Sequence, residues 1–267
     1  MTQGLISPDT TNLLVGKGSL LFQPTGAGSF YAVGNVPTLT LTPKTTLLDH
    51  FDSQAGTKTK DLTVVTEKTM EVKMQMEEFT AHNISLLVLG DIDNTDPTQP
   101  IVNIFTQASV TGHLKYYAAN DVGPRWYIDL PSVTFNPSGD LAPISDAFAS
   151  MEVTGTVNAQ SGIWGTIQLK KSVATLAPEN VLGPNIGGYP ISGDTLTANV
   201  GVWIGATSFT YLWKASGGAP VNSATSKTLV LAAGDVGKTI TVDVTAHNSI
   251  GTTGPVTSAA TTAVTAY

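Results

Sequence analysis

The sequence predicts a mainly β fold: a β-sandwich or barrel that contains one α-helix and a long extended arm, followed by a second β-sandwich. Charged residues make up only 12% of the 267 residues, so Thr, Ser, Asn and Gly must supply much of the polar surface. Thr and Val fit a pleated sheet and lose side-chain freedom in a helix. The 26 Gly and 15 Pro provide turns between many short strands.

The first strands are indicated by two apolar, partly alternating stretches within residues 12–46, separated by a glycine-containing turn. Alternation returns over residues 62–76. The spacing from Val65 to Met70 does not keep side chains on one face of a regular strand. We therefore expect a bulge or break between these two residues.

Between these strands lies LLDHFDSQAGTKTKDLTV, residues 47–64, which we call the arm. Its ends have strand character, whereas its middle is polar, mixed in charge and contains Gly56. Glycine permits chain reversal at a tip because it tolerates positive φ. A flexible surface hairpin of a monomer would have the same pattern. Long polar arms in compact domains usually have a use, so the pattern favours an arm that reaches a partner.

A helical period replaces the alternation in EEFTAHNISLLVLG, residues 77–90. Glu77 and Glu78 suit the positive N-terminal end of a helix, and Gly90 suits its C-terminal end. The residues near helical spacing, which we expect to pack the helix against the core, are Phe79, Ile84, Leu87 and Val88.

Further strands follow an acidic loop, and residues 162–171 close the first domain. Residues 172–187 are typical of a linker, and short strands at regular spacing come after it, which favours a β-sandwich. We predict domains at residues 1–174 and 175–267. Trp213, in the middle of a strand, is expected in the core of the second domain.

Bulk properties exclude several kinds of protein. The net charge is −7 and the basic residues are scattered, whereas gripping a phosphate backbone needs a basic patch. The absence of cysteine excludes disulfides, thiolate nucleophiles and cysteine-based metal sites. No uninterrupted run of 18 apolar residues and no signal-peptide pattern is visible, so we expect a protein made in a cytoplasm, without a membrane span.

No motif predicts catalysis or a cofactor. DVGKT at residues 235–239 resembles the end of a phosphate-binding loop, but Ala232 stands where the motif needs glycine, and a strand follows. DIDNTD at residues 91–96 has enough oxygen ligands for Ca²⁺, but it lacks the glycine and distant Glu of an EF-hand. We therefore expect neither a cofactor nor a metal.

The histidines and one tryptophan are further candidate site residues. Trp203 is flanked by glycine and could stack on a sugar or a base, although a structural role is favoured. The histidines lie far apart in sequence and no Ser/Asp arrangement near them indicates a triad. The four are His50, His82, His113 and His247. We expect a protein that is not an enzyme.

In combination, four stretches carry a resemblance to a known family. They are residues 33–43 (VGNVPTLTLTP), the arm, the helical segment 77–90 and residues 132–157 (SVTFNPSGDLAPISDAFASMEVTGTV). Together they resemble the tail tube proteins of long-tailed bacteriophages, over about residues 10–174.

The second domain resembles bacterial-type immunoglobulin-like modules, which are appended to several phage virion proteins. GPNIGGYPISGDTLTANVGVW, YLWKAS and DVGKTITVDVTAHNSIGTTG carry this similarity. The lack of a cysteine pair separates it from the disulfide-bonded antibody type.

The resemblance implies a tail-tube-type fold, whose subunits form hexameric rings, with sheets of neighbours joined into a β-barrel around a channel. The rings stack into the virion tail and meet tail terminator and tail-tip proteins; the subunit is made in the host bacterial cytoplasm. Double-stranded DNA passes through during ejection, and an acidic lumen would repel phosphate. Residues 1–174 contain ten Lys/Arg against sixteen Asp/Glu, which agrees with such a lumen. The family leans towards flexible tails without a sheath.

In this family a long hairpin or loop reaches the adjacent ring, so the arm is expected there, with its charges paired to complementary ones that set register. The arm residues concerned are Asp49, His50, Asp52, Gly56, Lys58, Lys60 and Asp61. The immunoglobulin-like domain would decorate the outside and bind cell-surface glycans weakly. The alternatives are another ring-forming tail or secretion-tube component, or a monomeric two-domain β adhesin or carbohydrate-binding protein.

Overall fold

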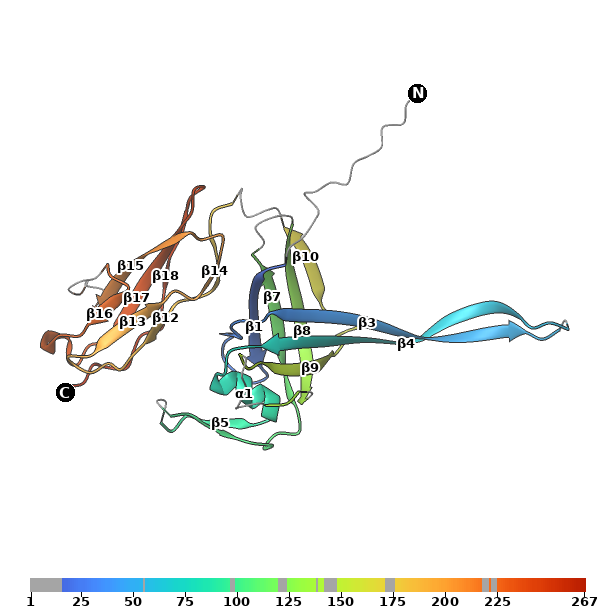
Figure 1. The fold of residues 1–267 in the computed structure, drawn as a ribbon. Coiled ribbons are helices and arrows are strands. Elements are labelled where there is room, and N and C mark those ends of the chain that lie inside the picture. The colour runs from blue at the N-terminus through green and yellow to red at the C-terminus, as the bar shows by residue number, and fades with distance from the viewer. Residues whose placement is uncertain are drawn as a thin grey trace, which may run out of the picture. The chain divides into compact units, whose positions relative to one another are not determined.

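The protein is described here by a computed structural model (Figure 1). The structure describes residues 16–54, 56–96, 99–119, 124–137, 139–141, 148–170, 176–217, 221 and 225–267. The chain divides into two compact units. The first unit comprises Ser19–Tyr116 and Ile128–Ile167; the second comprises Met1–Gly18, Tyr117–Tyr127 and Gln168–Tyr267. The predicted domain boundary between residues 174 and 175 lies outside the described residues.

The predicted mainly β fold is confirmed. The described residues form eighteen strands and a single α-helix, and the strands are arranged in antiparallel sheets. Of the two forms expected for the first domain, a closed barrel is absent from the described part of the chain, where the sheet is open. None of the described helices has the length and apolar character needed to cross a membrane.

The main sheet has the strand order β2-β1-β7-β8-β9-β4-β3, and β10 also pairs with β8. Its strands are β1 (Gly18–Pro24), β2 (Tyr31–Ala32), β3 (Thr38–Asp52), β4 (Thr59–Met76), β7 (Val110–Ala118), β8 (Arg125–Pro137), β9 (Met151–Val157) and β10 (Thr166–Lys170). A short hairpin of β5 (Asp91–Asp93) and β6 (Ile101–Asn103) forms a separate sheet. Residues 104–109, between β6 and β7, are not in a strand.

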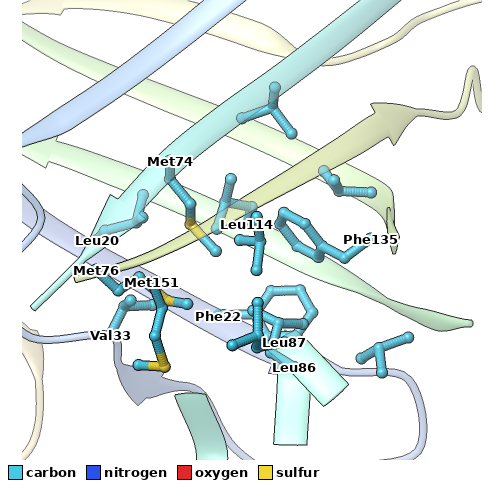
Figure 2. Close-up of a cluster of buried hydrophobic side chains, with 14 of the residues drawn as sticks. Leu20, Phe22, Val33, Met74, Met76, Leu86, Leu87, Leu114, Phe135 and Met151 are labelled. Carbon is cyan, nitrogen blue, oxygen red and sulfur yellow. The ribbon is translucent and has the colours of Figure 1, made fainter. Parts of the chain in front are cut away.

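The core of the first unit lies against one face of this sheet. Burial alternates along β9, as expected for a strand with one face on the core. Phe22 and Phe135 meet edge to face, with ring centroids 5.3 Å apart, and methionines of β4 and β9 fill the space beside them (Figure 2). Methionine suits such a position because its flexible side chain fits irregular gaps.

Strands β3 and β4 form one long hairpin whose register shifts twice. Thr46 lies opposite Glu67, but Leu47 lies opposite Val65, so Thr66 is an extra residue on β4. This shift confirms the bulge expected between Val65 and Met70. The second shift leaves Asp61 as the extra residue, between the pairs that His50 and Phe51 form.

Helix α1 (Ala81–Val88) is shorter than the predicted segment 77–90. Thr80 is its N-cap, because its hydroxyl accepts a hydrogen bond from the Asn83 amide. Glu77 and Glu78 lie before the helix and accept hydrogen bonds from Asn35 instead of facing the helix dipole. Both carboxylates therefore contact Asn35 and do not occupy the first turn of the helix, where they were predicted.

The four residues predicted to pack the helix differ in their positions. Leu87 is buried in the core, and Ile84 and Val88 are half-buried against it. Phe79 precedes the helix and is 41% exposed, so it does not contribute to the helix face. Leu86, which the sequence analysis did not select, is buried and takes part in the core.

Asn83 is a buried polar residue that links α1 to the sheet. Its Nδ2 donates to the carbonyl oxygens of Val33 and Glu78, both at 2.8 Å. We expect Asn83→Ala to lower the free energy of unfolding by about 1–3 kcal/mol, because these carbonyls lose their buried donor. Chemical denaturation measures this loss. Ser85→Ala is the matched control on the same helix, since its hydroxyl bonds only to the His82 carbonyl; equal losses for both variants would refute the link.

The second unit contains two three-stranded sheets, β12-β13-β16 and β15-β17-β18, and a two-stranded sheet, β11-β14. Its elements are β11 (Glu179–Leu182), β12 (Asn185–Gly187), β13 (Thr195–Asn199), β14 (Val202–Ile204), β15 (Ser208–Ala215), β16 (Thr228–Val230), the 3-10 helix η3 (Ala233–Asp235), β17 (Ile240–His247) and β18 (Thr252–Thr257). Trp213 is fully buried in the core of this unit. The DVGKT segment begins in η3 and continues into the turn before β17.

Candidate assembly surface on the arm

The arm, residues 47–64, extends beyond the rest of the sheet (Figure 1). Strand β4 pairs with β9 only from Met70 to Met76, so its earlier residues have β3 as their sole strand partner among the described residues. Every described side chain of the arm is exposed except that of Asp52, which is half-buried. Burial begins again at Met70, where β9 joins. The arm is therefore a two-stranded ribbon with solvent on both faces.

Both faces of this ribbon carry large apolar side chains. Directly opposed residues of antiparallel strands point to the same face. One face therefore holds the pair Leu48 and Val64 together with Leu62, which lies opposite His50. The exposed fractions of these three apolar side chains are 63%, 47% and 56%.

The other face holds the pair Leu47 and Val65, which are 55% and 47% exposed, and Phe51 nearer the tip, which is 48% exposed. Val65 immediately follows the arm. The sequence pattern of the arm pointed to its polar residues and not to this apolar surface. The strand-like ends of the arm contain these apolar residues. A strand pattern alone, however, does not distinguish buried apolar residues from exposed ones.

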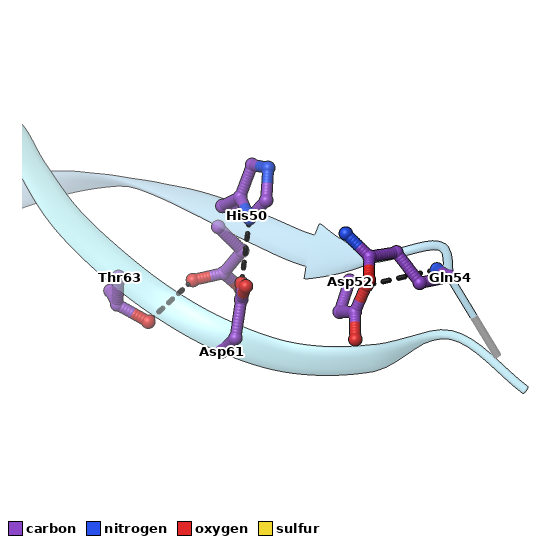
Figure 3. A network of polar contacts seen from close by, with 6 residues as sticks. His50, Asp52, Gln54, Asp61 and Thr63 are labelled. Atoms are coloured by element: carbon purple, nitrogen blue, oxygen red, sulfur yellow. Dashed lines mark hydrogen bonds and ion pairs between the residues drawn. The ribbon is translucent and has the colours of Figure 1, made fainter.

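Two pairs of ionisable side chains form within the arm, and Figure 3 shows one of them, between His50 and Asp61. Lys60 Nζ lies 2.8 Å from Asp49 Oδ1, and the Thr63 hydroxyl donates to the same oxygen at 2.8 Å. His50 Nδ1 lies 2.7 Å from Asp61 Oδ1. Within one chain, these groups therefore hold the two strands together across the ribbon. The expectation that they pair with a neighbouring ring stays a prediction.

The tip contains the remaining predicted arm residues. Asp52 Oδ1 accepts a hydrogen bond from the Gln54 amide at 2.9 Å, which begins the turn. Gly56 lies between β3 and β4 with open space around it. Its expected role in the chain reversal stays a prediction. Lys58 is exposed beside β4.

Asp49 provides a pH-dependent test of the arm pairing. Hydrogen bonds from Lys60 and Thr63 hold the pKa of its carboxyl below the ordinary value of 3.8. Because the folded pKa is lowered, the stabilisation is present above the unfolded pKa of about 3.9 and is lost as pH falls through the folded pKa. We expect Lys60→Ala to move the pKa of Asp49 up toward 3.8, as measured by NMR titration. Lys58→Ala is the control, and an equal shift there would contradict the pairing.

The edge of the sheet adds a second exposed feature. Strand β3 ends the strand order, so its outer side has no strand partner in the described part of the chain. Such an edge presents backbone N–H and C=O groups that can pair with another chain. Together, the open edge and the arm provide contact groups along the whole of β3.

The residues weighed for chemistry are distributed over separate places. His82 lies on α1 with its ring 4.7 Å from that of Tyr31, His113 contacts Asp129, and His247 contacts Thr210. His50 belongs to the arm. No group of three or more His, Cys, Asp or Glu residues among the described positions is arranged to hold a metal ion.

The acidic segment 91–96, expected to be a loop, begins in β5, and two of its carboxylates accept hydrogen bonds. The pKa of Asp91 is lowered by hydrogen bonds from Gln107 and Thr106, and that of Asp93 by hydrogen bonds from Thr95. Trp203 is half-buried, and its Nε1 donates to the Val200 carbonyl at 2.7 Å, so it is held as part of the second unit.

Residues 13–100 match the model of a family described as "Protein of unknown function UCP028589". This match covers β1 to β5, the arm and α1. No curated protein matches the chain.

Proposed function

We propose that this chain is the structural subunit of a bacteriophage tail tube. Copies of it form hexameric rings, and the rings stack into a tube that conducts DNA during ejection. The hexamer and the tube come from the family resemblance of residues 10–174. The observation that carries the proposal is the arm, which is exposed on both faces and carries apolar side chains on each.

The low stability expected of an isolated arm supports this proposal. An isolated two-stranded ribbon is at best marginally stable in water, and sheets usually need a third strand or a packed face. The arm has neither among the described residues, and its apolar side chains lie in water. A continuous exposed apolar surface of this kind is typical of an interaction site. Assembly with further copies would cover both the arm and the open edge of β3.

The charge of the chain is compatible with a DNA conduit. Phosphate-binding proteins use basic patches, and this chain has a net charge of −7. A wall with excess negative charge would repel the DNA backbone and let it slide past. The subunit would be made in the host cytoplasm and would end in the virion tail, beside terminator and tail-tip proteins.

Negative-stain electron microscopy of the purified protein over a concentration series tests the proposal. We expect rings at low concentration and hollow tubes at high concentration. Monomers at every concentration, including after addition of tail-tip complexes as initiators, would overturn the proposal. Monomers that bind glycans would instead favour a two-domain adhesin or carbohydrate-binding protein, and rings that never stack would favour a terminator-like component.

The second unit is proposed as an external decoration that binds cell-surface glycans weakly. It has its own buried core, separate from that of the first unit. We therefore expect a chain that ends at residue 174 to assemble into tubes while phage adsorption to cells decreases. Adsorption assays on phage with the shortened protein measure this effect. Unchanged adsorption would overturn the adhesion role without affecting the tube.

A further inference from the structure

A cavity of about 510 Å³ lies in the first unit, among the end of β1, helix α1 and the start of β7. Phe22, Leu86 and Val110 are buried residues that line it. Asp91 and Ser109 also line it and are exposed. Its volume is within the roughly 300–1,000 Å³ range in which proteins enclose small organic groups. A large apolar side chain, together with the residues next to it in the chain, would therefore fit into this cavity.

The cavity and the tip of the arm lie at opposite ends of β4. This strand starts beside the tip at Thr59 and ends at Met76, shortly before α1 begins at Ala81. Eighteen residues of strand extend over roughly 55 Å. Because β3 pairs with β4 along this length, the arm does not fold back to its own cavity (Figure 1). An arm that fills this cavity belongs to another copy.

The tip carries the groups that the cavity can accept. Phe51 is the sole aromatic residue of the arm and its apolar side chain nearest the tip, and it is 48% exposed. Lys58, which is exposed just before β4 begins, adds a positive charge near the tip. At the cavity, Asp91 supplies a negative charge, since hydrogen bonds from Gln107 and Thr106 lower the pKa of its carboxyl. The tip of the arm and the cavity thus both have apolar groups, and Lys58 at the tip and Asp91 at the cavity have opposite charges.

We propose that the arm of one copy inserts Phe51 into this cavity on a second copy, with Lys58 close to Asp91. The inference rests on the proposed tube and names the surface that the arm contacts in the next ring. A protrusion at one end and its receptor at the other form a head-to-tail contact, which closes into a ring or continues as an open filament, depending on the rotation between copies. In the proposed tube, we assign this contact to the filament direction, between stacked rings.

Chemical crosslinking of two single-cysteine variants tests this contact. The chain has no cysteine, so a short bismaleimide reacts only at the introduced thiols. We expect Ser53→Cys and Ser109→Cys proteins, mixed under tube-forming conditions, to give crosslinked dimers, because Ser53 is exposed near the tip and its substitution keeps Phe51. Ser53→Cys mixed with Thr156→Cys is the matched control, because Thr156 is exposed on β9 and does not line the cavity.

The outcomes separate the two proposals. Wild-type tubes without a crosslink to Ser109, or with equal crosslinking to Thr156, would overturn the cavity contact and leave the tube proposal standing. Failure of the wild type to form rings or tubes would overturn both.

A second variant, Phe51→Ala, should raise the concentration needed for stacking about 30-fold, the loss typical of a buried aromatic anchor. Rings should still form, and far-UV circular dichroism should be unchanged. Tubes of this variant at the wild-type concentration would also contradict the contact.

Discussion

Trp213→Ala should lower the free energy of unfolding of the second unit by about 3–5 kcal/mol, the range for truncating a large aromatic residue in a core. Trp213 is completely buried, and its indole packs among residues of β13, β16 and β17. Its Nε1 also donates to the Ser226 carbonyl at 2.8 Å, and this acceptor would lose its partner. Hydrogen exchange followed by mass spectrometry measures the loss in the full chain, because it reports the two units separately.

Trp203→Phe is the matched control for this substitution. Trp203 is half-buried and meets Phe209 edge to face, with ring centroids 6.1 Å apart, and phenylalanine keeps much of that contact. We expect a loss below about 2 kcal/mol, from the hydrogen bond to Val200 and part of the buried surface. Unchanged protection of β15 and β17 in Trp213→Ala would show that the second unit does not depend on this residue. Reduced protection from hydrogen exchange in β4 and β9 of Trp213→Ala would show that the two units do not unfold independently.

Alternation along the chain predicted the main strands of the first unit because it reports a local property. In a sheet with one face on the core, every second residue is buried, and β9 follows this rule from Met151 to Val157. The same reasoning located the bulge, because Met70 lies five positions after Val65, and an odd spacing puts two residues of a regular strand on opposite faces. A single extra residue at Thr66 restores a common face.

The ends of the helix could not be predicted in the same way. Glu77 and Glu78 have the charge expected at a helix N-terminus, yet both bond to Asn35, more than forty residues earlier in the chain. A local pattern contains no information about such a partner. Thr80 was the better signal, since threonine is a preferred N-cap and its hydroxyl serves as one here.

The arm shows the same limit at the candidate site. The sequence indicated the position of the arm and its charges. It did not indicate that Asp49 and Lys60 lie close enough on the two strands to form an ion pair across the ribbon. That contact depends on the register of β3 against β4, which the bulges set. Leu48 and Leu62 are exposed because β9 does not extend along this part of β4. Strand β9 begins at Met151, about ninety residues after Leu62, so a local pattern contains no information about where the pairing stops.

Replacing the apolar face of the arm in the variant Leu48→Ser, Leu62→Ser, Val64→Ser should raise the concentration needed for tube formation about a hundredfold without unfolding the protein. About half of each side chain is exposed and available for burial in an assembly. Burying a whole large aliphatic side chain contributes about 1.5–3 kcal/mol, so these three together contribute roughly 3 kcal/mol per contact. That energy corresponds to about a hundredfold rise in the concentration needed for assembly. Sedimentation over a concentration series measures it.

The matched control is the variant Asp49→Asn, Lys60→Gln, which removes a charge pair of the same ribbon and keeps the apolar side chains. If burial of apolar surface drives assembly, this control should form tubes near the wild-type concentration, because exposed ion pairs contribute little. If charge complementarity with the next ring drives it, the order reverses: the charge variant fails and the serine variant assembles. The two variants therefore decide between the apolar contact that the structure favours and the charge pairing that the sequence suggests.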